Sequence, residues 1–173
     1  MEIVIRKAEI KDIPLIVDLN YLTWVVTYPD AYKNLRVKDI IDYLATKDVK
    51  AKEKQIQGEI ESEIKSILIA EADGELLGYI ITQLDSEQKQ MELSSIYVHP
   101  LHQRKGIGRA LIQKAFENLN VDIFLECADY NMSTIEFYKK NGFEIVGPGE
   151  FKIVFKNSAL LETVKMRRTA TTK

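Results

Sequence analysis

The segment from Met91 to Leu111 constrains the fold of this chain more than any other stretch. Its first part, Met91 to Val98, is rich in β-branched and aromatic residues and predicts a buried strand, which His99-Pro100 ends. A basic loop with two glycines follows from Gln103 to Gly108, and apolar residues then recur at helical spacing. A strand, a glycine loop and a helix in this order gather free backbone N–H groups at the positive end of the helix dipole. They predict an anion site suited to phosphate.

The composition indicates a globular chain with a hydrophobic core and excludes several other classes of protein. Its 173 residues suit one domain, and 46% hydrophobic with 29% charged residues argue against disorder. No apolar run approaches the ~18 residues of a membrane-spanning helix, and the first residues lack the layout of a secretory signal. A formal net charge of −2 argues against a nucleic-acid partner. The single cysteine, Cys127, cannot form an internal disulfide, so we expect a cytoplasmic protein without a membrane partner.

Periodicity and turn residues predict strands and helices along the whole chain. Asp73-Gly74, between two apolar runs, predicts a hairpin. The strand at 121–128 follows a strand–helix crossover, so it should run parallel to the strand at 91–98. Residues 147–161 fit either a hairpin or a longer loop. The expected elements are strands at 3–8, 66–71, 76–82, 91–98, 121–128, 143–146 and 162–167, and helices at 12–28, 40–44, 56–64, 107–118 and 131–141.

The stretch 37–65 is the most polar part of the chain, and its narrow apolar stripes place its helices on the surface. These helices fit either a solvated pair or a movable wall over a substrate cleft. No shift in composition marks a domain boundary. We therefore expect one domain over residues 1–173, with a disordered tail at 169–173.

Two motifs carry a resemblance to a known family. The first is Gln103-Arg104-Lys105-Gly106-Ile107-Gly108, and the second runs from Asn131 to Phe143. They resemble the Q/R-x-x-G-x-G/A and N-x-x-A-x-x-F-Y-x-x-x-G-F signatures of the GCN5-related N-acetyltransferase (GNAT) superfamily, with Thr134 where alanine is common. Each motif lies in the expected strand–helix context, so the pair is far more specific than a lone glycine loop. The order of elements also resembles the family over essentially the whole chain.

The resemblance implies a fold and a cosubstrate. The fold is mixed α/β (α+β), a three-layer α-β-α arrangement around a mostly antiparallel, twisted sheet of about seven strands. A parallel pair of strands splays apart at the coenzyme A (CoA) site. Acetyl-CoA is the implied cosubstrate, with its pyrophosphate on the loop amides and its pantetheine arm along the strand, and no metal is expected. The implied cofactor-binding residues are Ile96, Tyr97, Val98, Gln103, Arg104, Lys105, Gly106, Ile107, Gly108, Arg109, Asn131 and Tyr138.

The reaction that the resemblance implies is direct attack of an amine on the acetyl-CoA thioester. Tyr138 occupies the position of the family's general acid, although the local pattern alone favours a core aromatic residue. The backbone N–H of Val98 is the implied donor to the developing oxyanion. Glu92 is the candidate base, and strand alternation should place its side chain on one face with Ser94 and Ile96. The alternatives for Glu92 are an exposed edge carboxylate, with deprotonation through water or binding of a neutral amine.

The acceptor amine is less constrained by the sequence. The start at Ile5-Arg6-Lys7-Ala8, the Trp24 and Tyr28 pair and the strand at 92–98 look most like the polyamine (spermidine/spermine) acetyltransferases called PaiA-type. Trp24, Tyr28 and Glu92 are then candidate substrate residues, because a polycation favours acidic and aromatic walls; core packing is the alternative for the two aromatics. Competing functions are acetylation of protein or peptide N-termini or lysines, and non-catalytic sensing of acyl-CoA. The chain fits a monomer or a homodimer.

Overall fold

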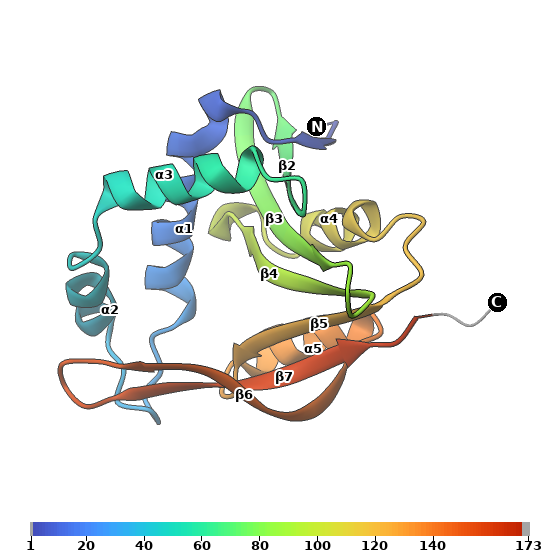
Figure 1. Cartoon of the computed structure of the whole chain (residues 1–173). Helices are drawn as coiled ribbons and strands as arrows, with labels where there is room; N and C mark the ends of the chain where they lie inside the picture. Colours follow the sequence, from blue (N-terminus) through green and yellow to red (C-terminus); the bar gives the residue numbers. More distant parts are fainter. Residues whose placement is uncertain (1, 171–173) are drawn as a thin grey trace.

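The computed structural model describes residues 2–170 (Figure 1). None of the helices in this range has the length and apolarity needed to cross a bilayer. The elements in chain order are β1 (Val4–Lys7), η1 (Ile10–Asp12), α1 (Ile13–Thr27), α2 (Val37–Leu44), α3 (Val49–Ile60), β2 (Lys65–Ala72), β3 (Glu75–Asp85), β4 (Gln90–Val98), η2 (Pro100–His102), α4 (Ile107–Ala115), β5 (Asp122–Ala128), α5 (Met132–Lys140), β6 (Glu144–Val154) and β7 (Leu160–Arg168).

All seven strands form one mixed sheet in the order β1-β2-β3-β4-β5-β7-β6. The one parallel pair is β4–β5, as the crossover through α4 predicted. Its pairing extends only over Gln90–Glu92 and Asp122–Phe124, and the two strands then separate. Figure 1 shows the result: the β1–β4 half and the β5–β7 half of the sheet diverge from this short seam. The predicted fold, with its splayed parallel pair, is confirmed.

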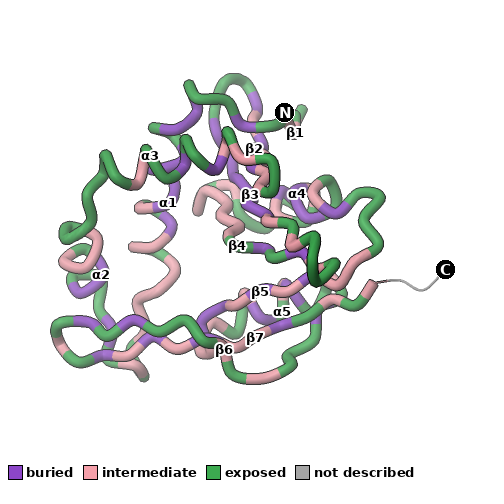
Figure 2. The backbone as a smooth tube through the Cα atoms, in the orientation of Figure 1, coloured by how far each residue is buried: buried purple, intermediate pink, exposed green. Residues whose placement is uncertain are grey.

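The core has three parts. Figure 2 marks the buried segments of the strands and helices that contribute to them. One cluster packs α4 and α5 against the sheet, and Leu111, Phe143 and Met166 are almost fully buried in it. A second cluster packs α1 and α3 against the other face, around Ile16 and Ile56. The third joins α2 and the end of α1 to the β6–β7 hairpin. The sheet therefore has helices on both faces, with a separate small core under the hairpin.

A β-bulge in β4 changes which of its side chains face which cluster. Ile81 pairs with Ser95 and Thr82 with Leu93, so Ser94 is an extra residue on β4. After the bulge, Ile96 packs in the same cluster as Leu93. Glu92 is exposed on the opposite face. The prediction that Glu92 and Ile96 share a face is wrong, because the extra residue inverts the alternation.

Several element ends differ from the sequence prediction. Residues 147–161 form a hairpin rather than a longer loop. β6 and β7 pair from Glu144 opposite Arg167 to Val154 opposite Leu160, with breaks in register. The last helix before β2 ends at Ile60, and Ile64 lies beyond it with an exposed side chain. The helix that begins at Ile107 ends at Ala115. The tail predicted to be disordered lies mostly at 171–173, outside the described residues.

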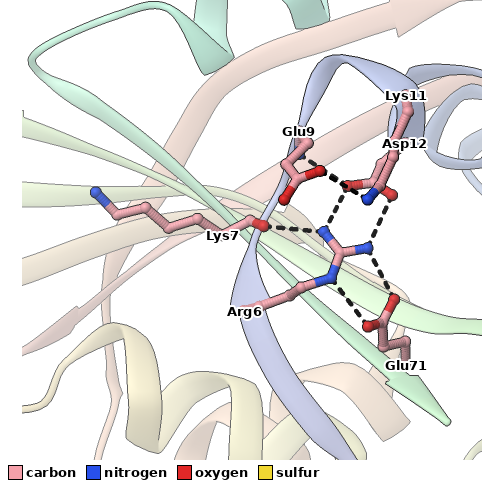
Figure 3. Close-up of polar contacts among 6 residues, drawn as sticks. All are labelled: Arg6, Lys7, Glu9, Lys11, Asp12 and Glu71. Carbon is pink, nitrogen blue, oxygen red and sulfur yellow. Dashed lines mark hydrogen bonds and ion pairs between the residues drawn. The ribbon is translucent and has the colours of Figure 1, made fainter.

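An ion-pair network ties β1 to the start of α1 (Figure 3). The Arg6 guanidinium lies 2.7 Å from Asp12 and 2.8 Å from Glu71, with further hydrogen bonds of 2.9–3.0 Å to both carboxylates. Asp12 also accepts the Glu9 backbone N–H at 2.8 Å. The hydrogen bond from Arg6 holds the pKa of Asp12 below its usual range. Asp12 thus precedes α1 as predicted, but its side chain binds Arg6 rather than capping the helix.

Candidate active site

A cleft of about 1370 Å³ opens where β4 and β5 separate. Its walls come from α1 on one side and from the β6–β7 hairpin on the other, with β4 and β5 between them. The loop after β4 and the face of α5 complete it. The segments 91–98, 103–109 and 131–141 therefore contribute to one cavity together with Trp24 and Tyr28. Lys105 and the polar stretch 37–65 do not line it.

The loop before α4 presents free backbone N–H groups to this cleft. The first hydrogen bond of the helix runs from the Ala110 N–H to the Gly106 carbonyl at 2.9 Å. The N–H groups of Ile107, Gly108 and Arg109 consequently have no partner within the helix. Gly106 has φ +85°, a left-handed conformation that a side chain disfavours. The second glycine, Gly108, allows the helix to approach α5 closely, since a Cβ at this position would lie 3.2 Å from the Phe137 ring.

The far end of β4 has an unpaired edge that faces β5. His99 donates its N–H to the Leu77 carbonyl at 2.8 Å. Hydrogen-bonding directions alternate along an antiparallel strand, so the N–H and C=O of Val98 point away from β3. The Gln103 side chain reaches that Val98 carbonyl at 3.3 Å. By the same alternation the backbone of Ile96 also faces the gap, and that of Tyr97 faces β3.

Tyr138 projects from α5 into the cleft while its ring is buried. It lies in the helix that Asn131 begins, whose side-chain oxygen accepts the Thr134 N–H at 3.2 Å. The phenol is 5% exposed and lines the cavity. Burial raises the pKa of Tyr138 well above its ordinary value, so the hydroxyl is protonated at neutral pH, as an exposed phenol is, and is a weaker acid than one. The arrangement suits a proton donor.

The candidate acceptor residues all line the same cleft. Trp24 and Tyr28 pack against each other, whereas Glu92 is exposed. Trp24 and Tyr28 meet edge to face with centroids 4.7 Å apart. The Trp24 indole donates to the Tyr97 hydroxyl at 2.9 Å, and the Tyr28 hydroxyl lies 3.5 Å from the same oxygen. These aromatics therefore both pack and form the cleft wall. Glu92 is exposed, and within residues 2–170 it takes part in no hydrogen bond or ion pair with another side chain.

Comparison with known proteins decides the family. The model of the acetyltransferase (GNAT) family matches residues 29–143. The chain belongs to the GNAT family. It is an N-acetyltransferase that depends on acetyl-CoA, as the two motifs predicted.

Named relatives and solved structures extend over most of the chain. A spermidine N(1)-acetyltransferase of Thermoplasma acidophilum is 28% identical over 152 residues, covering 84% of this chain and 90% of that protein. An N-alpha-acetyltransferase of Sulfurisphaera tokodaii is 28% identical over 157 residues, covering 82% and 80%. The structure of PaiA N-acetyltransferase from Thermoplasma acidophilum with coenzyme A superposes with a TM-score of 0.72 at 22% identity, over 98% of this chain and 99% of that one. The predicted resemblance to PaiA-type acetyltransferases is confirmed.

One residue of this GNAT cleft escaped the sequence analysis. The Glu126 carboxylate on β5 accepts the backbone N–H groups of Glu150 at 3.0 Å and of Phe151 at 2.9 Å, and the Thr163 hydroxyl at 2.6 Å. Burial opposes its ionisation, but these hydrogen bonds prevail and lower the pKa of Glu126. The alternation of buried Ile123, Leu125 and Cys127 was a usable signal, since it directs Glu126 to the face that Glu92 occupies.

The charges of the GNAT cleft divide by the element that carries them. The loop before α4 contributes Arg104, and the first turn of α4 contributes Arg109. The strands contribute mostly carboxylates, and α5 contributes one charge of each sign. The strand residues concerned are Asp85, Glu92, Glu126 and Glu150, with Lys165 as their one cation among the described lining residues. The end of the cleft at this loop, where the sequence predicts the cofactor, is thus basic, and the strand floor is predominantly acidic.

The Cys127 thiol and the possible metal ligands complete the chemistry of the described residues. Burial raises the pKa of the Cys127 thiol to about 12, and its sulfur lies 3.9 Å from that of Met166. A thiol in this state is a poor nucleophile, and Cys127 packs in the core as a small buried residue. Within residues 2–170, no three His, Cys, Asp or Glu side chains gather as a metal site requires.

Proposed function

We propose that this enzyme transfers the acetyl group of acetyl-CoA to a primary amine of a small cationic acceptor, a polyamine such as spermidine or spermine. The observation that carries this proposal is the acidic strand floor, which lies between aromatic walls of the cleft. An acceptor with several ammonium groups places one at the thioester and the others against carboxylates and aromatic faces. The named spermidine acetyltransferase among its relatives supports the same assignment.

In this proposal the cofactor end works mainly through the backbone. The N–H groups at 107–109, with Arg104, Lys105 and Arg109 around them, bind the pyrophosphate. Gln103 and Asn131 border this site and the pantetheine arm. That arm hydrogen-bonds to the free edge of β4 at Ile96 and Val98, and Tyr97 holds the strand in place through its side chain. Binding by backbone groups requires only the left-handed turn and the strand edge that are present.

The chemical step joins groups from β4 and α5. The amine nitrogen forms a bond to the thioester carbon, and the backbone N–H of Val98 stabilises the oxygen as it becomes negative. The carbon–sulfur bond then breaks, and Tyr138 gives its proton to the leaving thiolate. The proton that the amine loses goes to Glu92 directly or through water. The Tyr138 phenolate is afterwards reprotonated from solvent through the open cleft.

A second acceptor class has an observation in its favour. The N-alpha-acetyltransferase relative has the same identity as the spermidine acetyltransferase, 28%. Acetylation of a peptide N-terminus or lysine is therefore the alternative. A non-catalytic acyl-CoA sensor fits less well, because it needs neither a protonated phenol in the cleft nor a free carboxylate on the strand floor.

The deciding experiment is a panel of acceptors at a fixed, saturating concentration of acetyl-CoA. Spermidine and spermine are compared with a peptide bearing a free N-terminus, the same peptide with an internal lysine, and an aminoglycoside. We expect kcat/KM for the polyamines to exceed that for the other acceptors by about tenfold or more. Equal or better turnover of the peptide would reject the polyamine assignment and leave the GNAT activity intact.

A further inference from the structure

The second half of β6 contains a bulge that faces the cleft. β6 advances from Pro148 to Lys152 while β7 moves only from Val164 to Glu162. Residues 149–151 thus stand opposite the single residue Thr163. Glu150 and Phe151 are both exposed, and both line the cavity across from α1. The bulge is consequently the part of β6 that borders the cleft.

A single carboxylate holds this bulge in place. Glu126 reaches from β5, across β7, and accepts the N–H groups of Glu150 and Phe151, two of the three bulge residues. Thr163 completes the contact, since its hydroxyl donates to Glu126 and lies 3.1 Å from the Phe151 carbonyl. Backbone groups that leave a ladder need new partners. Here one side chain supplies them.

Gly149 shows how closely the carboxylate and the bulge fit. A Cβ at this position would overlap both the Thr163 hydroxyl and the Glu126 carboxylate. The backbone passes so near to Glu126 that only glycine leaves room. Gly147, in the same strand, has no atom within 4 Å of such a Cβ. The requirement for glycine is therefore local to the contact.

We propose that Glu126 is a positioning residue that sets acceptor selectivity: its carboxylate fixes the 149–151 bulge, and the fixed bulge forms the acceptor wall opposite α1. Glu126 does not take the proton of the amine, because three donors already occupy its oxygens and stabilise its charged form. The acceptor class in this inference rests on the proposed function. The link between Glu126 and the bulge does not.

The test combines two variants with a matched control. Glu126→Ala removes the acceptor of the two N–H groups, and Gly149→Ala displaces the bulge while the Glu126 side chain is still present. Both are expected to raise KM for spermidine by about tenfold, and KM for acetyl-CoA should change by less than about twofold. Gly147→Ala is the control and leaves both KM values as in the wild type. The pH dependence of kcat keeps its shape in all three variants.

Amide hydrogen exchange separates this inference from the choice of acceptor. The N–H groups of Glu150 and Phe151 should exchange slowly in the wild type and faster in Glu126→Ala, with the remaining sheet amides unaffected. If peptides prove to be the substrate, the same KM shift is expected for the peptide. Unchanged exchange at Glu150 and Phe151 would overturn the proposal. So would a large loss of kcat with an unchanged amine KM, which would make Glu126 the base.

Discussion

The two ends of the cleft are built from different parts of the protein. The proposed cofactor end consists of backbone groups, namely the N-terminus of α4 and the free edge of β4. The proposed acceptor end consists of side chains from α1, β4 and β5 together with a bulge in β6. A backbone site needs glycines at set positions and tolerates most other changes. A side-chain site can change its ligand by a single substitution. This difference between a backbone site and a side-chain site explains how one kind of cofactor end can serve acetyltransferases with different acceptors.

Substitution of the residue between the two ends has the largest expected effect. Tyr138→Phe removes the proton donor and keeps the buried ring, so we expect kcat to fall by about 100-fold. KM for acetyl-CoA should remain within about twofold, because the backbone sites are intact. Steady-state kinetics with both substrates measures this. Tyr32→Phe is the control at a fully exposed tyrosine. An unchanged kcat would remove Tyr138 from the mechanism.

Damage confined to the cofactor end should leave the acceptor end unaffected. Gly106→Ala places a side chain at φ +85°, where the obstacle is the conformation, as no atom lies within 4 Å of the added Cβ. We expect about tenfold weaker binding of acetyl-CoA in calorimetry, with little change in KM for the amine. Gly74→Ala introduces the same kind of strain at φ +82° in the β2–β3 turn. If Gly74→Ala weakened the binding of acetyl-CoA to the same extent, the loop amides before α4 would not be the binding site.

The smallest expected effect concerns the anchoring of α1, which carries the aromatic wall. Asp12→Asn should destabilise the protein by about 1 kcal/mol at neutral pH, since it weakens the pair with Arg6. The pKa of Asp12 is lower in the folded state than in the unfolded chain, so this stability is fully present above the unfolded pKa. It is lost as pH falls through the folded pKa. Urea unfolding should show the difference between wild type and variant at pH 7, and this difference should shrink as the pH falls below the ordinary aspartate pKa of ~3.9.

Asp18→Asn provides the reference for that measurement. Asp18 is exposed on the same helix. Its substitution should change the free energy of unfolding by less than about 0.5 kcal/mol at either pH. A loss in Asp12→Asn that persisted in acid would show that the Arg6 pair does not stabilise the fold.

The same contrast between the two ends explains what the sequence could predict. The strand–loop–helix at 91–111 and the helix after Asn131 carry local signals, namely period, caps and glycines, and the structure has both elements there. The parallel β4–β5 pair followed from the handedness of its crossover. These features depend on residues close together in the chain.

The features that were missed depend on distant residues. The bulge at Ser94 places Ile96 on the face opposite Glu92. No residue type in β4 predicts this bulge. The contact of Glu126 joins β5 to residues 150, 151 and 163, so its purpose is visible only after the hairpin forms. The 147–161 segment lacks a clean period because its register breaks at Gly147 and again after Pro148.

The most direct test of the acidic acceptor end compares two amines that differ by one charge. 1,4-Diaminobutane and n-butylamine have the same chain length, and only the diamine carries a second ammonium group. If the strand carboxylates bind the non-reacting end of the acceptor, kcat/KM for the diamine should exceed that for the monoamine by about tenfold or more at low salt, and salt should reduce the ratio. Equal values for the two amines would contradict an acceptor site built for cations.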